Sequence, residues 1–457
     1  METKLTEGNP MRIILRFVFP VFLGNVFQQL YNMADSMIVG NFVGSRALAG
    51  VGSTGTIMFF VIGSSLGMAT GFSVLTSQKF GAGNEEETRR SVANGIILTA
   101  ILAVVMTVIS LSLMPTILRL MNTPDSIYEE AYTYISTICA GLVATVYYNL
   151  FSSYLRAIGN SRTPLYFLIF STGLNVILDL IFIIVFHWGV AGAARATVLA
   201  QGISAVLCLI YIMKNVPTLR PRRHHWRLNG DDTKKQLAIG VPMSLQFGIT
   251  ASGTMVMQSA INRFEEAIAV YTAANKIQSV LMQGLLSLGQ GMASYAGQNY
   301  GKADLYRIHQ GTKDAMKIAL AYSVLAATLA ITFMPNLLHL FFPADVDIAP
   351  LLPWAKTYIY ECMSCYIPLG MIFVYRNTMQ GCGYGIEAMS MGFVELAARL
   401  STALLSMRLD SYPLAVGCDP VAWVAGGIYG FILYLIVRER IRRSFEADAL
   451  EKAHTAE

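Results

Sequence analysis

The chain has 457 residues, of which 54% are hydrophobic and only 13% are charged, and its mean hydropathy is +0.51. Soluble domains carry about a quarter charged residues, so this composition excludes a soluble globular protein. The net charge of +5 comes mainly from basic residues beside the hydrophobic segments, which leaves no contiguous soluble domain to bind nucleic acid. The alternating segments of about 10 residues that mark a β-barrel are absent, and an all-α polytopic membrane protein is expected instead.

Apolar segments near the roughly 20 residues needed to cross a bilayer recur along nearly the whole chain. Hydropathy and helix-breaking residues predict twelve spans, at 12–40, 46–77, 90–114, 127–155, 164–186, 190–213, 235–261, 266–297, 310–334, 351–379, 385–407 and 412–437. The polar N-terminus, METKLTEGNP, lacks the pattern of a cleavable signal, so we expect the first span to remain in the protein.

Basic residues gather in alternate loops over the first eight spans, and this distribution predicts the orientation of the chain. They follow spans 2, 4, 6 and 8 and open the C-terminal tail: Lys79, Arg89, Arg90; Arg156, Arg162; Lys214, Arg220, Arg222, Arg223, Arg227, Lys234, Lys235; Lys302, Arg307, Lys313; and Arg438, Arg440, Arg442, Arg443. The intervening loops hold one arginine at most. Both termini are therefore expected to be cytoplasmic.

The two halves of the chain resemble each other, which predicts an internal duplication. The matches, in the same order in both halves, are QKFG (78–81) with QNYG (298–301), Gly71 with Gly291, Pro20 with Pro242 and Tyr134 with Tyr358. Each half starts on the same side of the membrane, so the repeat is parallel. The expected divisions are an N-terminal six-helix lobe at 1–213, a cytoplasmic linker at 214–234, a C-terminal six-helix lobe at 235–437 and a cytoplasmic tail at 438–457.

Two aspartates interrupt hydrophobic spans of the first half. An acid at membrane depth is costly unless it is paired, hydrated or protonated, and it is a functional-site hypothesis by default. Tyr31 shares a helix face with Asp35, and Asn175 shares one with Asp179. Counting residues from the span ends puts both aspartates at similar depth in the outer half of the lobe. The predicted proton or hard-cation site consists of Asp35, Asp179, Asn175, Tyr31 and Thr197.

The second half carries a different set of polar residues. Glu395 and Arg399 are spaced i, i+4 and are expected to neutralise each other, whereas Glu361 is a candidate functional acid. Cys362 and Cys365 form a C-x-x-C without a second pair, which favours packing over metal binding. Flexible thioethers and aromatic faces suit bulky cations. The side chains expected to line a substrate cavity are Gln28, Tyr148, Phe151, Met257, Met282, Met292 and Glu361.

The two six-span halves, the Q-x-[FY]-G-x-[GA] turn after spans 2 and 8 and the LRAIGNSRTP loop (155–164) resemble the multidrug and toxic compound extrusion (MATE) family. The residues around Asp35 and Asp179 resemble the cation site of its DinF-like branch. The resemblance implies a V-shaped pair of lobes, export of organic cations and other amphipathic drugs, and inward flow of H⁺ or Na⁺ as the driving force. Span 7 has no acid, which departs from the C-lobe site described for the NorM-type branch.

The expected function is therefore secondary antiport of small molecules by a monomeric, non-enzymatic protein of a bacterial or archaeal cytoplasmic membrane. The coupling ion, H⁺ or Na⁺, binds in the N-lobe, and no other cofactor is expected. The alternative is a lipid-linked oligosaccharide flippase of the same superfamily, although twelve spans and few central basic residues count against it. The scattered histidines disfavour a membrane enzyme, and the lack of a short filter-like loop disfavours a channel.

Overall fold

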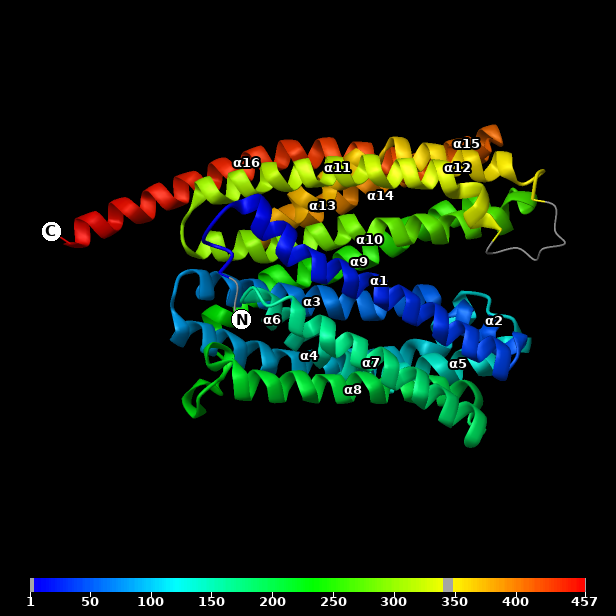
Figure 1. Cartoon of the computed structure of the whole chain (residues 1–457), viewed down its shortest axis with the longest axis horizontal. Helices are drawn as coiled ribbons and strands as arrows, with labels where there is room; N and C mark the ends of the chain where they lie inside the picture. Colours follow the sequence, from blue (N-terminus) through cyan, green and yellow to red (C-terminus); the bar gives the residue numbers. More distant parts are fainter. Residues whose placement is uncertain (1–3, 340–347, 457) are drawn as a thin grey trace. The chain divides into compact units, whose positions relative to one another are not determined.

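A computed structural model describes residues 4–339 and 348–456. Within these ranges the chain is helical and contains no strand (Figure 1). Eight helices are long and apolar enough to cross a membrane, and two bent helix pairs also pass the test as broken spans. The eight helices are α1 (Pro10–Phe42), α3 (Gly55–Gly81), α4 (Glu85–Leu120), α7 with its π-helical end η1 (Arg162–Val185), α8 (Gly189–Asn215), α11 (Leu305–Leu338), α14 (Gly385–Leu409) and α16 (Cys418–Ala456).

The bent pairs are α5 (Asp125–Ala140) with α6 (Leu142–Ala157), at 51°, and α12 (Leu352–Ser364) with α13 (Tyr366–Gly381), at 45°. Two more helices, α9 (Gly230–Ile261) and α10 (Glu265–Gly301), are long enough to span but fall below the same hydropathy test. They coincide with the seventh and eighth predicted spans. With them, the helices correspond one to one with the twelve predicted segments.

Four predicted spans are not single straight helices. The second is divided into α2 (Ser45–Ser53) and α3, and the last into α15 (Tyr412–Val416) and α16. The fourth and tenth are the two bent pairs, which break at Gly141 and Cys365. These corrections concern backbone geometry at single residues, which hydropathy averaged over a window does not resolve.

The duplication is visible in the backbone. Helix α3 ends at Gly81 and α10 at Gly301, and the next helix of each half begins after an equivalent cap. Asn84 accepts a hydrogen bond from the backbone of Glu87 at 3.1 Å, and Asp304 accepts one from Arg307 at 2.9 Å. The QKFG and QNYG segments therefore end a helix and precede an N-cap in both halves.

The described chain forms two compact units, each with its own helix packing. Unit 1 contains residues 19–247, in which α3 packs on α4 and α6, and α8 packs on α6 and α7. Unit 2 contains residues 5–18 and 248–457, in which α13 lies against α10 and α16, and α14 lies against α16. The units differ from the predicted lobes at two places, because 5–18 belong to unit 2 and 235–247 to unit 1.

Glycines explain both exceptions. In unit 1 a Cβ on Gly71 would lie 2.3 Å from the Cα of Gly240, so α3 and the first part of α9 touch backbone to backbone. In unit 2 a Cβ on Gly291 would lie 2.3 Å from a methyl carbon of Val18, so the absence of a side chain on α10 leaves room for the Val18 side chain of α1. The first helix of each half therefore begins in the unit that consists mainly of the other half.

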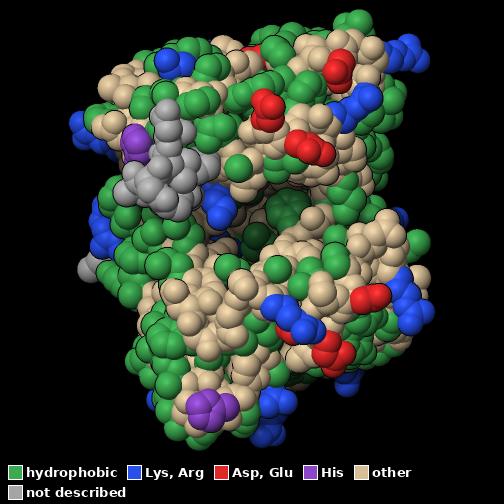
Figure 2. All heavy atoms as spheres, turned by 90° about the vertical axis from the view of Figure 1, so that its right-hand side faces the viewer, with side chains coloured by type: hydrophobic (Ala, Val, Ile, Leu, Met, Phe, Trp, Pro, Cys, Tyr) green, Lys and Arg blue, Asp and Glu red, His purple; other side chains and the backbone are tan. Residues whose placement is uncertain are grey.

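Large apolar side chains reach the surface over wide areas (Figure 2). On α4, for example, Ile101, Val104 and Val108 are 50%, 60% and 58% exposed. Patches of this extent are rare on soluble monomers and normal on helices that contact lipid.

Candidate functional site

Six polar side chains from four helices of unit 1 converge in its interior. None of them is more than 8% exposed. They are Tyr31 and Asp35 on α1, Tyr134 on α5, Asn175 and Asp179 on α7, and Thr197 on α8. The structure thus brings together all five residues of the predicted cation site and adds Tyr134. The sequence offered one signal for this tyrosine, its match with Tyr358 in the repeat.

Hydrogen bonds connect this group. The hydroxyls of Tyr31 and Thr197 lie 2.9 Å apart. The network assigns the Asn175 amide with its nitrogen toward Asp179, so that it donates to Oδ2 at 2.8 Å while its oxygen accepts from the Thr197 backbone N–H at 3.1 Å. Tyr134 hydrogen-bonds Asp35, and the Asp35 and Asp179 carboxyl groups are within hydrogen-bonding reach of each other.

Two acceptor positions in the group are open. Oδ1 of Asp35 and Oδ1 of Asp179 are buried, and neither receives a hydrogen bond from a donor among the described residues. An ionised carboxylate only accepts hydrogen bonds, so two of them cannot bond each other unless a proton lies between them. A cation that bridged the oxygens would satisfy them as well. Either a proton or a small cation between the two carboxyl groups would therefore satisfy the chemistry of the pair.

The local sequence explains the placement. Asn175 and Asp179 are one turn apart on α7, which puts both side chains on one face. Immediately after Asp179 the helix widens into the π-helical turn η1 (Ile181–Val185), a feature often found at functional sites. An apolar cluster that includes Tyr134 and the small residues Ala193 and Ala194 of α8 packs beside the group. Small side chains there allow the helices to approach closely.

Unit 2 contains charged residues in a different arrangement. Arg399 Nη1 lies 3.8 Å from Glu395 Oε2, but each residue has a closer partner. Glu395 pairs with Arg376, and Arg399 Nε donates to Asp419 Oδ1 at 2.7 Å. The predicted Glu395–Arg399 pair is thus half of a four-residue network with two charges of each sign. Its charges neutralise one another, as expected for a structural network.

The residues predicted to line a substrate cavity separate into two groups. Phe151, Met257 and Met292 are 5%, 2% and 0% exposed, and Phe151 belongs to an apolar core cluster with Tyr154. These three side chains are packed and do not present a surface to a ligand in this structure. The partly exposed members are Gln28, Tyr148, Met282 and Glu361. Cys362 and Cys365 are free thiols.

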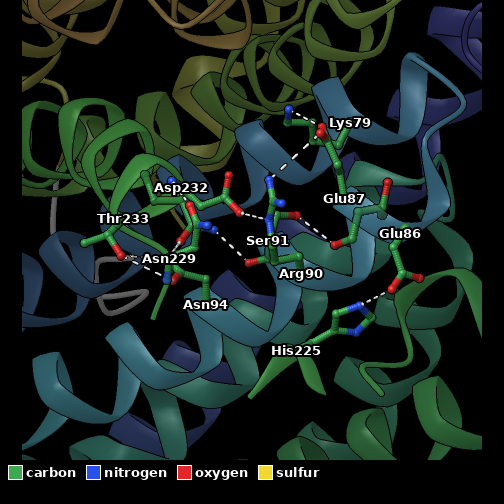
Figure 3. A network of polar contacts seen from close by, with 12 residues as sticks. Lys79, Glu86, Glu87, Arg90, Ser91, Asn94, His225, Asn229, Asp232 and Thr233 are labelled. Carbon is green, nitrogen blue, oxygen red and sulfur yellow. Dashed lines mark hydrogen bonds and ion pairs between the residues drawn. The ribbon is translucent and has the colours of Figure 1, made fainter. Parts of the chain in front are cut away.

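A second polar network, which the sequence did not predict, attaches the segment after α8 to α4 (Figure 3). Asp232 is 2% exposed and accepts a hydrogen bond from Arg90 Nε at 2.7 Å. Asn94, fully buried, donates to Gln236 at 2.8 Å and accepts from the Asn229 backbone at 2.9 Å. The residues before α9 and its first turns are therefore fixed within unit 1.

Glu86, at the start of α4, joins the same network through two histidines. Its Oε1 lies 2.6 Å from His224 Nε2 and 2.7 Å from His225 Nε2. The three side chains have the composition of a metal site. However, His225 Nδ1 accepts the Arg222 backbone N–H at 2.9 Å, so the ring proton is on Nε2 and faces Glu86. A metal-bound histidine would instead donate from its other nitrogen. Glu86, His224 and His225 are therefore a hydrogen-bonded group that joins the segment after α8 to the start of α4.

Membrane-length helices in two repeated halves, with a buried carboxyl pair inside one unit, define a polytopic membrane protein with an internal duplication. The MatE family profile matches residues 20–181 and 242–404, so the chain belongs to the MATE family of membrane transporters.

Its relatives include "Probable multidrug resistance protein YpnP" of Bacillus subtilis, 26% identical over 96% of this chain and 98% of the relative. The "FAD transporter" of Shewanella oneidensis is 21% identical over 96% of this chain and 97% of its own. Among solved structures, a MATE transporter in an "outward-facing conformation" has a TM-score of 0.88 at 23% identity, covering 97% of this chain and 99% of that one. The all-α architecture in two six-span halves is confirmed.

Proposed function

We propose that this protein is a secondary antiporter that exports organic cations and other amphipathic drugs, and that H⁺ bound between Asp35 and Asp179 is the coupling ion. The observation that carries the proposal is the buried carboxyl pair, whose two Oδ1 atoms receive no donor among the described residues. Transfer of a proton to this pair and its removal change the charge of the site, which is what coupling requires.

The amide orientation favours H⁺ over Na⁺. A sodium site needs several oxygen ligands directed at the ion, in the manner of other hard cations. Here Asn175 turns its nitrogen toward Asp179 and gives its oxygen to the backbone of Thr197. The Tyr31 and Thr197 hydroxyls form a hydrogen bond with each other. The group therefore supplies donors around the acids in place of a ring of oxygens.

Protonation is proposed to act on transport through α1. When Asp35 and Asp179 are neutral, they accept hydrogen bonds from the surrounding donors less strongly. Helix α1 carries both Asp35 and Pro20. Proline removes a backbone hydrogen bond and is the commonest site of a helix kink. Pro20 also lies next to the point where α1 passes from unit 2 to unit 1. A bend there would transmit the charge state of the pair to substrate affinity.

The remaining features are part of the same proposal. The protein works as a monomer in a bacterial or archaeal cytoplasmic membrane with both termini inside, and it transports its substrates without chemical change. The distribution of basic loops supports this orientation. One relative is named "FAD transporter", so FAD belongs among the compounds to be tested.

The test is ethidium transport in proteoliposomes, with a pH gradient and a Na⁺ gradient imposed separately. Transport driven by the pH gradient alone is expected, with loss of that drive in Asp179→Asn. Asp125→Asn, which changes an exposed aspartate at the start of α5, is the matched control and should transport normally. Drive by Na⁺ alone would refute the choice of H⁺, and transport that needs neither gradient would refute antiport.

A further inference from the structure

The segment between α8 and α9 is basic, and it also exposes two large apolar side chains. Residues 214–235 carry seven basic residues and two acidic ones. Among them, Trp226 and Leu228 are 47% and 51% exposed. We call the following exposed set the linker surface: Lys214, Arg220, Arg223, Trp226, Arg227 and Leu228.

The outward direction of these side chains follows from what the segment buries. Val216 and Leu219 are 3% and 0% exposed and belong to the same apolar core cluster as Ile212 of α8. His225 is 4% exposed and donates to Glu86. With these side chains directed inward, the arginines that alternate with them are directed outward.

The linker surface is also fixed in place at the ends of helices. Arg89 of α4 donates to the carbonyl of Pro217 at 3.1 Å, and Arg90 holds Asp232. Lys214 is in the last turn of α8, and Glu86 is in the first turn of α4. The segment therefore lies against the ends of two membrane-length helices, and the ends of helices that cross a bilayer lie near its headgroups.

The composition of the surface identifies its partner. Arg220, Arg223 and Arg227 make no ion pair with an acid among the described residues, so three cationic heads are available. Tryptophan is enriched at membrane–water interfaces, where its ring is partly apolar and partly wet. Clusters of basic residues directly beside a span attract anionic lipid headgroups. A soluble polyanion would use the charges but leaves the exposed Trp226 and Leu228 unexplained.

We propose that the linker surface binds anionic phospholipid headgroups of the adjacent leaflet, with Trp226 and Leu228 entering the headgroup region. The arginines contact lipid phosphates, and the two apolar side chains leave water. On the predicted orientation this is the cytoplasmic leaflet. The proposal concerns lipid binding and does not depend on the coupling ion or the exported substrate.

The first test is titration of the detergent-solubilised full-length protein with phosphatidylglycerol, with bound lipids counted by native mass spectrometry. Arg220→Gln, Arg223→Gln and Arg227→Gln together should weaken the tightest binding steps, by up to about fivefold for each charge removed. The matched control, Lys302→Gln with Lys313→Gln and Arg443→Gln, removes the same charge from exposed positions of unit 2 and should retain those steps. Equal weakening in the two triple variants would overturn the proposal.

The second test uses quenching of tryptophan fluorescence in proteoliposomes. Brominated phosphatidylglycerol should quench the wild type more than Trp226→Phe, and brominated phosphatidylcholine should show a smaller difference. No difference between wild type and Trp226→Phe with either lipid would show that Trp226 stays in water and would overturn the proposal. Release of phosphatidylglycerol from the linker surface by an equimolar RNA oligonucleotide would also overturn it, because a soluble polyanion would then be the preferred partner.

Discussion

Replacement of Gly71 by alanine should destabilise unit 1, because α3 and α9 meet there with no room for a side chain. The added Cβ would lie 2.3 Å from the Cα of Gly240 and 2.6 Å from its nitrogen, whereas ordinary contacts begin at 3.4 Å. The two backbones must therefore separate by about 1 Å, and neither can rotate away as a side chain can. Overpacking of this kind costs about 1–3 kcal/mol of unfolding free energy.

The assay is the midpoint of thermal unfolding of the purified protein in detergent, measured for Gly71→Ala and for Gly173→Ala. Gly173 is within α7 and has no atom within 4 Å of an added Cβ, so its replacement should stabilise the helix by about 0.5–1 kcal/mol. The two glycine-to-alanine changes are thus expected to shift the midpoint in opposite directions. If Gly71→Ala unfolds at or above the wild-type midpoint, the packing of the first part of α9 on unit 1 is refuted.

Three further outcomes are expected. Gly291→Ala should cost less than Gly71→Ala in the same unfolding assay, because the added Cβ meets a methyl group of Val18 instead of backbone; an equal cost would contradict this. Asp232→Ala should lower the unfolding free energy by about 1.5–3 kcal/mol because it removes the acceptor of the charged hydrogen bond from Arg90, and a stability equal to wild type would contradict the anchoring of the linker. Glu395→Ala should cost about 3–5 kcal/mol, since it leaves Arg376 and Arg399 buried together, and unchanged stability would show that the network is not structural.

The number and order of the helices could be predicted because crossing a bilayer imposes a length and composition on each one. The repeat was also visible, since the QKFG and QNYG segments end a helix in both halves. The transfer of residues 5–18 and 235–247 to the opposite units could not be predicted. It depends on the close approach of Gly71 to Gly240 and of Gly291 to Val18, and a glycine in a sequence does not say what approaches it.

The residues of the candidate site could likewise be predicted only in part. Asp35 and Asp179 stand out because acids are rare in apolar spans, and helix periodicity assigns their companions to the same faces. Tyr134 matches Tyr358 in the repeat, but that match does not indicate a place beside Asp35, which only the fold reveals. Phe151 and Met292, which the sequence predicts to line a cavity, are packed in this structure, because apolar side chains suit a packed core as well as a cavity.

The central claim, that Asp35 and Asp179 hold the coupling ion, is tested most directly by proton release on substrate binding. The purified protein in weakly buffered detergent solution, with a pH-indicating dye, receives ethidium, and the protons released are measured for the wild type, Asp35→Asn, Asp179→Asn and Asp125→Asn. We expect release from the wild type and Asp125→Asn, and loss of release from both site variants although they remain folded. Release from Asp35→Asn and Asp179→Asn at the wild-type level would contradict the account.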